Sequence, residues 1–273
     1  AWGVPTAHLV SPTVWAWRQG RIHKIARSVD LMLCLFPFEQ AIYLEHGIDA
    51  RFVGHPLADE VPLQPDQAAA REALGLAADA RVLALLPGSR GGEVAMLGAL
   101  FLETATRLKS RYPGLKVIIP AANAARLSQL RELIAASDSG AVELVDGRSR
   151  EVMLAADAVL MASGTVTLEA LLLKRPMVVA YRMAPMSWAL VRRLATTPFA
   201  ALPNILAGER VVPEFLQDDA TVDNLASAVG ELLEGGADPQ VRRFTEIHQA
   251  LRLGFAERSA DALVALARSH RHG

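Results

Sequence analysis

The residue types best suited to chemistry lie in two glycine-containing loops, each of which follows an apolar run. The first loop covers residues 87–93 and reads Pro-Gly-Ser-Arg-Gly-Gly-Glu. Glycines let backbone N–H groups approach an anion, the start of a following helix carries partial positive charge, and Arg90 adds a full charge. The loop therefore suits a phosphate group, and a tight strand-to-helix turn that binds nothing is the open alternative. It is not a Walker loop, because no Gly-Lys-Ser/Thr follows it.

The second loop covers residues 162–170 and reads Ala-Ser-Gly-Thr-Val-Thr-Leu-Glu-Ala. Ser163 or Thr165 can cap the helix that begins here, which leaves backbone N–H groups facing outward. Glu169 falls one turn further on, on the same helix face as Thr165. An anion site beside a carboxylate suits a nucleotide sugar, with the diphosphate on the N–H groups and the ribose hydroxyls on the carboxylate. The alternative is that Glu169 is a solvated helix residue.

The elements that position these loops follow from an alternation of short β-rich runs with helical patterns. Such alternation is typical of parallel sheets covered by helices on both faces, so the fold class is α/β. A segment with several prolines, residues 54–65, separates two such series and is the best linker candidate. After Pro213 the pattern predicts helices alone, at 221–234 and 241–267. The predicted strands are Leu31 to Phe36, Ala50 to Val53, Val82 to Leu86, Lys116 to Pro120, Val142 to Val145, Ala158 to Ala162 and Met177 to Tyr181.

Composition narrows the classes of partner. The chain has 28 Lys+Arg against 29 Asp+Glu, so no bulk field draws it to nucleic acid, and anion recognition has to be local. Cys34 has no second cysteine to pair with, which excludes a disulfide within the chain and a cysteine-based zinc site and predicts core packing in a reducing compartment. The histidines show no metal-binding spacing. No uncharged apolar run reaches the roughly 18 residues of a spanning helix, and we expect no secretion signal.

Several strings together are similar to one family. They are Val-Ser-Pro-Thr-Val-Trp-Ala-Trp-Arg at 10–18, Phe-Val-Gly-His-Pro at 52–56, Leu-Pro-Gly-Ser-Arg at 86–90, Ala-Ser-Gly-Thr at 162–165 and Leu-Pro-Asn-Ile-Leu-Ala-Gly at 202–208. In order and spacing the chain resembles the lipid-A-disaccharide synthases. The resemblance implies the GT-B fold of two Rossmann-like domains. It also implies inverting, metal-independent transfer from UDP-2,3-diacylglucosamine to 2,3-diacylglucosamine 1-phosphate, giving lipid A disaccharide 1-phosphate and UDP, with no cofactor.

The same resemblance predicts a domain layout. Residues 1–56 correspond to the remainder of an N-terminal acceptor-side domain, and residues 57–80 to a linker with the helix that follows it. Residues 81–236 correspond to the UDP-sugar donor domain. Residues 237–273 correspond to C-terminal helices that pack back on the N-terminal half or are swapped between the subunits of a homodimer. The first part of the family's N-terminal half has no counterpart here, so that domain is expected to be incomplete and the catalytic residue cannot be assigned.

Carried over position by position, the resemblance implies a set of donor contacts. Ser89, Arg90 and Glu93 fall on the nucleotide side, Ser163, Gly164 and Thr165 on the diphosphate, Glu169 on the ribose and Asn204 on a polar part of the donor. Helix N-termini and Arg90 would then replace a divalent cation in stabilising the leaving UDP. His55, between a glycine and a proline, is expected to be a structural loop residue.

The acyl chains of such substrates imply contact with the cytoplasmic face of the inner membrane, where a cytoplasmic, peripheral enzyme would work. Aromatic or methionine side chains beside arginine suit that contact, and a buried core with a solvated charged face is the alternative. The candidates are Trp15, Trp17, Arg18, Met186, Trp188, Arg192 and Arg193. The apolar side chains over 244–266 are expected to lack part of the surface of the N-terminal half on which they would pack. We therefore expect these helices to self-associate or to stay mobile.

Two other functions remain open. One is another UDP-sugar enzyme of the same fold, either an epimerase of UDP-N-acetylglucosamine or the glycosyltransferase of peptidoglycan assembly. The other is a non-catalytic UDP-sugar binding module. Turnover of an acylated donor would favour the synthase, and turnover of an unacylated donor would favour the other enzymes. Tight UDP binding without turnover would favour the module.

Overall fold

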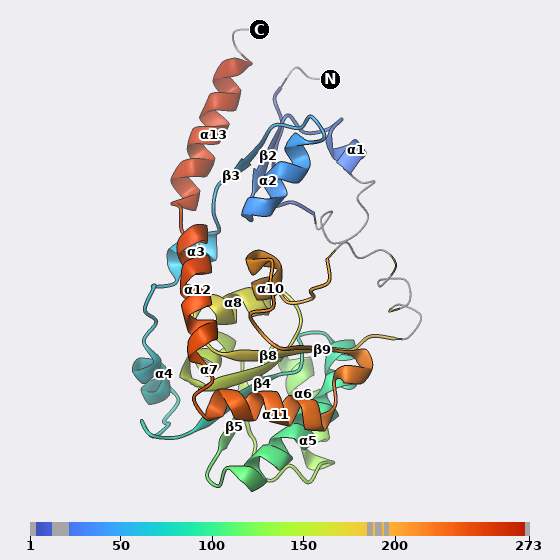
Figure 1. Cartoon of the computed structure of the whole chain (residues 1–273), viewed down its shortest axis with the longest axis vertical. Coiled ribbons are helices and arrows are strands. Elements are labelled where there is room, and N and C mark those ends of the chain that lie inside the picture. The colour runs from blue at the N-terminus through green and yellow to red at the C-terminus, as the bar shows by residue number, and fades with distance from the viewer. Residues whose placement is uncertain (1–3, 13–21, 185–187, 189–192, 194–196, 271–273) are drawn as a thin grey trace. The chain divides into compact units, whose positions relative to one another are not determined.

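The computed structural model describes residues 4–12, 22–184, 197–270 and the two positions 188 and 193 (Figure 1). The chain divides into two compact units. Unit 1 comprises Ala1–Pro62, Met186–Pro198 and Glu246–Gly273, and unit 2 comprises Leu63–Pro185 and Phe199–Thr245. Among the described residues, no helix combines the length and the apolar character needed to cross a bilayer.

Unit 2 is built on a six-stranded parallel sheet with the order β6-β5-β4-β7-β8-β9. The central strands β4 and β7 are continuous apolar runs that are buried at every position, as expected for a parallel sheet covered on both faces. The strands are β4 (Val82–Leu86), β5 (Lys116–Ala121), β6 (Glu143–Asp146), β7 (Ala158–Ala162), β8 (Met177–Tyr181) and β9 (Glu214–Leu216).

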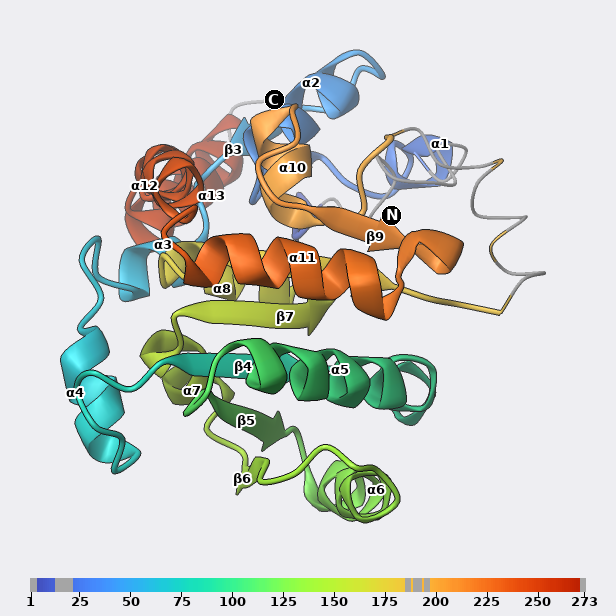
Figure 2. The same cartoon turned by 60° about the horizontal axis from the view of Figure 1, so that its bottom comes forward.

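Helices cover both faces of this sheet (Figure 2). The long helix α5 (Gly91–Arg111) and α11 (Val222–Leu233) contact each other and pack on alternate strand positions such as Leu83 and Leu85. Helix α7 (Ser149–Ala155) contacts β4, β5 and α8 (Val166–Leu172). The remaining elements of unit 2 are α4 (Gln67–Ala73), α6 (Ala124–Ala135), α10 (Leu202–Ala207) and the turn η2 (Gln217–Asp219).

The strand order of unit 2 contains a topological switch between β4 and β7. The chain leaves β4 to form β5 and β6 on one side, and then returns to form β7 on the other side. In open α/β sheets, ligands bind outside the carboxyl ends of the strands at such a switch. Leu86 is opposite Met161 in the register, so the loops that follow these two strands begin side by side. These are the two loops that the sequence analysis selected.

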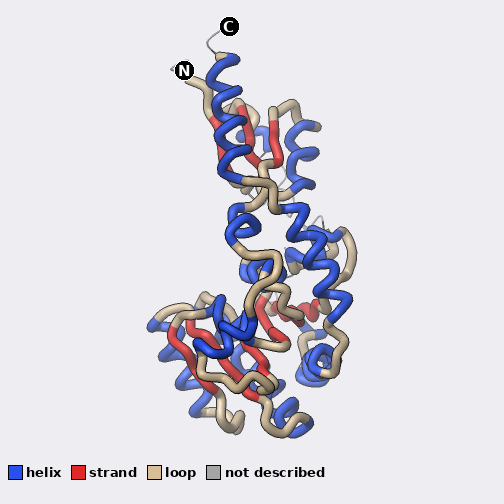
Figure 3. Tube along the Cα trace, turned by 90° about the vertical axis from the view of Figure 1, so that its left-hand side faces the viewer, coloured by secondary structure: helices blue, strands red, loops and turns tan. Residues whose placement is uncertain are grey.

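Unit 1 holds a three-stranded parallel sheet in the order β1-β2-β3, whose strands are red in Figure 3. The central strand β2 packs on one side with Tyr43 and on the other with Ala262. Cys34 ends β2 and is buried, and burial raises the pKa of its thiol to about 12. The elements are β1 (Ala7–Leu9), α1 (Ile22–Ile25), β2 (Leu31–Cys34), α2 (Pro37–Leu44), β3 (Ala50–Phe52), α3 (Pro56–Glu60) and α13 (Phe255–Ser269).

The C-terminal helices are α12 (Asp238–Leu251), within which the boundary between the units falls, and α13. The apolar stripe predicted across them is divided. In α12, Phe244 and Leu251 are buried, whereas Leu263 and Val264 of α13 are 44% and 48% exposed. The described part of α13 instead packs on β2 through Ala262 and Leu266.

One expectation about the elements is corrected. Strands do not stop at Pro213, because Glu214–Leu216 forms β9 and pairs in parallel with β8. Residues 54–65, the linker candidate, contain the boundary between the units at Pro62 and Leu63, and also a short helix that the sequence did not predict, α3 (Pro56–Glu60), with His55 as its N-cap. Both elements are short and lack a long apolar run, so periodicity alone does not reveal them.

Candidate functional site

The first loop is organised around the carboxylate of Glu93. Its Oε2 accepts hydrogen bonds from the backbone N–H groups of Ser89 at 3.0 Å and Arg90 at 3.1 Å. Gly88 has a φ of +130°, and a Cβ placed there would lie 2.4 Å from the Cβ of Glu93. A carboxylate of the chain itself therefore occupies two N–H groups that an anion would use. We reassign Glu93 from ligand contact to shaping this loop.

Arg90 is the group that the first loop presents to solvent. Its guanidinium is 86% exposed and forms a 3.3 Å ion pair with the other oxygen of Glu93. Because exposed ion pairs contribute little free energy, a phosphate group could draw Arg90 away from Glu93 at small cost. The first loop therefore supplies a full positive charge at the switch between β4 and β7.

A second arginine lies against the same loop and was missed by the sequence analysis. A Cβ placed on Gly91 would lie 2.4 Å from Nη1 of Arg126, so the glycine makes room for this guanidinium. Nε of Arg126 is buried and has no hydrogen-bond partner among the described residues. Nearby, the side chain of Gln129 donates to the carbonyl of Gly91 at 3.1 Å. Only the contact between α6 and the start of α5 reveals Arg126.

The second loop leaves backbone donors unused. The hydroxyl of Ser163 donates to the carbonyl of Ala200 at 2.7 Å, and Gly164 and Thr165 are exposed. The N–H groups of Gly164, Thr165 and Val166 have no acceptor among the described residues. The hydroxyl of Thr167, the second residue of α8, donates to the Gly164 carbonyl at 2.7 Å. Three adjacent donors at the start of α8 are therefore available for an anion.

Glu169 lies in the first turn of α8 and has a specific partner. Nε of Arg150, on α7, donates to Oε1 of Glu169 at 2.7 Å. The Glu169 side chain is 19% exposed and that of Arg150 is 49% exposed. Glu169 is therefore mostly covered and held by a partner, which favours a specific role over that of a solvated helix residue. Arg150 was not selected from the sequence, because the pairing depends on the contact between α7 and α8.

Asn204 is fully buried and hydrogen-bonded within the chain. Its side-chain oxygen accepts from the N–H groups of Val211 and Val212, and its side-chain nitrogen donates to the Val212 carbonyl and to Glu214. An amide has two donor and two acceptor positions, and all four are used here. We therefore reassign Asn204 from donor contact to organising the turn between α10 and β9.

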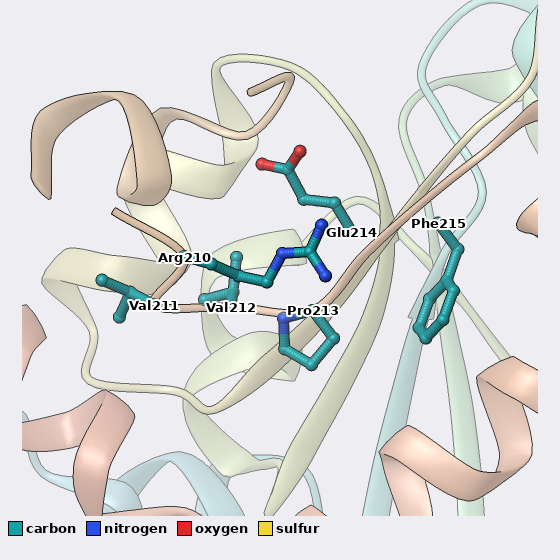
Figure 4. A pocket seen from close by; sticks show the side chains of 6 residues that line it. All are labelled: Arg210, Val211, Val212, Pro213, Glu214 and Phe215. Atoms are coloured by element: carbon teal, nitrogen blue, oxygen red, sulfur yellow. The ribbon is translucent and has the colours of Figure 1, made fainter. Parts of the chain in front are cut away.

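A shallow pocket of about 300 Å³ runs along residues 210–215. Figure 4 shows the side chains of Glu214 and Phe215 on opposite sides of β9, as alternation along a strand requires. The Glu214 carboxylate accepts from the N–H groups of Ala200 and Ala201, before α10. The pocket lies at the β9 edge of the sheet, away from the switch between β4 and β7, so we assign it no ligand.

The remaining predicted residues are only partly placed. Of the membrane candidates, Trp188 is half-buried and Arg193 is exposed. Trp15, Trp17, Arg18, Met186 and Arg192 lie outside the described residues. Within the described part of the chain, no group of three His, Cys, Asp or Glu residues is arranged to hold a metal ion.

Comparison with known proteins supplies the family. A family model described as lipid-A-disaccharide synthetase matches residues 3–267. The lipid-A-disaccharide synthase of Pseudomonas aeruginosa strain LESB58 is 54% identical over 264 residues, which cover 97% of this chain and 70% of that protein. The enzyme of the same name from Pseudomonas fluorescens strain Pf0-1 is 54% identical over 97% of this chain and 69% of its own length.

Solved structures show the same fold at low sequence identity. A UDP-GlcNAc 2-epimerase from Neisseria meningitidis bound to UDP-GlcNAc matches with a TM-score of 0.58 and 13% identity, over 95% of this chain and 69% of that chain. An S. aureus MnaA-UDP co-structure matches with a TM-score of 0.59 and 14% identity, over 95% of this chain and 68% of that chain. WaaG, a glycosyltransferase involved in lipopolysaccharide biosynthesis, matches with a TM-score of 0.51 and 14% identity, over 90% of this chain and 64% of that chain.

These matches confirm the resemblance, the α/β fold class of the GT-B type and the enzyme class that the sequence predicts. The chain thus belongs to the lipid-A-disaccharide synthetase family, the glycosyltransferases of lipid A biosynthesis.

Proposed function

We propose that unit 2 binds a UDP-linked sugar at the carboxyl ends of β4 and β7. The observation that carries this proposal is the row of three unused N–H groups at the start of α8, beside Arg90 on the neighbouring loop and Glu169 one turn away. The diphosphate is held by those N–H groups and by Arg90, and the ribose hydroxyls donate to Glu169. Ser163 fixes the loop through its bond to Ala200, and Ser89 stands beside Arg90 on the nucleotide side.

The reaction is inverting transfer from UDP-2,3-diacylglucosamine to 2,3-diacylglucosamine 1-phosphate. The attacking acceptor hydroxyl forms a bond to the anomeric carbon and loses its proton to a base, while the bond from that carbon to the UDP oxygen breaks. Negative charge grows on the departing UDP. N–H groups aimed at that charge from the start of α8, together with the Arg90 guanidinium, stabilise it without a divalent cation. The base is not among the residues assigned here.

The acyl chains of both substrates place the enzyme at the cytoplasmic face of the inner membrane, as a cytoplasmic, peripheral protein. Trp188 and Arg193 belong to the segment proposed for that contact. The exposed side chains of Leu263 and Val264 on α13 support a homodimer contact through the face of α13 that does not pack on β2.

The test is calorimetric titration of UDP into the chain with and without EDTA. We expect the same dissociation constant in both buffers, because the charged and dipolar groups proposed to hold the diphosphate are all protein groups. A strict requirement for Mg²⁺ would contradict the metal-independent mechanism.

Turnover separates this function from the alternatives. Transfer from the acylated donor supports the synthase, and reaction of unacylated UDP-N-acetylglucosamine supports an epimerase or the peptidoglycan enzyme. UDP binding without turnover of either donor supports a binding module. The N. meningitidis epimerase is 13% identical to this chain, which supports the shared fold and not a shared reaction.

A further inference from the structure

Glu169 creates an electrostatic problem for the proposed site. Its carboxylate lies in the first turn of α8, and the N–H groups proposed for the diphosphate lie at the start of the same helix. A carboxylate and a diphosphate so close together repel each other. The partial positive charge of the helix start offsets only part of that repulsion. A ligand that needs both groups therefore requires a cation beside Glu169.

Arg150 supplies that cation in a fixed geometry. Its Nε donates to Oε1 of Glu169 at 2.7 Å, and no donor among the described residues contacts Oε2. The neighbouring Arg148 is not an alternative partner, because it pairs with Glu151 and donates to the carbonyl of Ala73. The carboxylate is thus neutralised at one oxygen and open at the other.

Helix stability does not explain the position of Arg150. It is the second residue of α7, where the positive end of the helix dipole disfavours a cation. Its side chain is half exposed, so little apolar surface is gained by burying it. The ion pair with Glu169 on α8 is the interaction that accounts for an arginine at this position.

We propose that Arg150 is a positioning residue for Glu169, a role that rests on the proposed function. It holds Oε1 so that Oε2 faces the ribose hydroxyls, and it cancels the charge that would repel the diphosphate. The ligand class follows: a nucleoside diphosphate with an intact ribose diol. A diphosphate without the diol gains nothing from Glu169.

The test measures UDP binding by calorimetry in four proteins: the parent, Arg150→Met, Glu169→Gln and the double variant. We expect Arg150→Met to weaken UDP binding about tenfold in the parent background and less than twofold in the Glu169→Gln background, because residues in contact have non-additive effects. Arg150→Lys, which keeps the charge, should recover most of the loss. Equal losses in both backgrounds would mean that Arg150 contacts the ligand directly, and would overturn its role through Glu169.

The ligand series provides the second readout. Glu169→Gln should weaken UDP binding but should not weaken the binding of 2′,3′-dideoxyuridine 5′-diphosphate, and an equal loss for both ligands would overturn the ribose assignment. Arg148→Met is the matched control, because it removes a neighbouring exposed ion pair and should leave UDP binding unchanged. A parent protein that does not bind UDP at all would refute the proposed function itself, which keeps the two failures distinguishable.

Discussion

Acidic side chains serve two different purposes in this chain, and the hydrogen-bond partners of each side chain show which purpose it serves. Glu93 and Glu214 accept hydrogen bonds from backbone N–H groups next to the starts of helices, which shapes the loops. Glu169 also lies at the start of a helix, but its partner is an arginine on another helix, and the backbone donors before it are left open. That difference is the reason to place the ligand at the second loop.

At the residue scale, His55 makes a pH-dependent contribution to the free energy of unfolding. Its Nδ1 accepts from the N–H of Leu57 and caps α3, which requires an unprotonated nitrogen. Burial lowers the pKa of His55, and the nearby Asp59 opposes that shift. His55 therefore takes up a proton at a higher pH in the unfolded chain than in the folded chain. The stabilisation that neutral His55 provides is complete above pH 6.5 and is lost as the pH falls through the lower pKa of the folded state.

The measurement is the free energy of unfolding between pH 7.5 and pH 5 for the parent and for His55→Asn. Asparagine keeps a capping oxygen but does not titrate. We expect the parent to lose more stability than the variant on acidification. Parallel pH curves for the two proteins would show that the folded His55 binds its proton as readily as the unfolded one.

At the scale of elements, α13 depends on a cap that comes from another helix. Asp59 of α3 accepts from the N–H groups of Gly254 and Phe255, at the start of α13. We predict that Asp59→Ala costs about 1–2 kcal/mol and speeds amide hydrogen exchange in the first turns of α13. Asp66→Ala, which removes the cap of α4 in unit 2, is the control and should leave α13 exchange unchanged.

The sequence predicted the elements that carry a recognisable pattern in their own residues, such as an apolar run. The bounds of β4, β7 and β8 agree with the predicted runs, because each is a buried apolar stretch. Strands β1 and β9 were missed because neither has a buried residue of its own, so that their pairing partners, and not their own side chains, make them strands.

The same distinction holds for the site. The spacing of Thr165 and Glu169 is local, so the sequence placed them together. Arg150 and Arg126 come from distant segments, and the internal hydrogen bonds of Asn204 are made to residues after its own helix. No sequence pattern encodes those contacts, which form only when the sheet brings the helices together.

At the scale of the whole molecule, every group proposed to bind UDP belongs to unit 2. We predict that UDP at 100 times its dissociation constant stabilises unit 2 by about 2.7 kcal/mol. Hydrogen exchange should slow in β4 and β7, while exchange in β2 of unit 1 stays the same. Equal protection of β2 would show that the ligand is bound by both units or that they unfold as one.

The division of unit 1 between segments on either side of unit 2 affects the order in which the two units can fold during synthesis. Leu31 and Leu33 of β2 are translated before the strands of unit 2, but the α13 residues that cover them are translated after those strands. Unit 2 has all its strands as soon as β9 has been made. A nascent chain therefore carries the bare apolar face of β2 while the strands of unit 2 are synthesised, and exposed apolar surface of this kind favours aggregation. A stop codon between β9 and α13 would leave the six-stranded sheet complete and that face permanently uncovered.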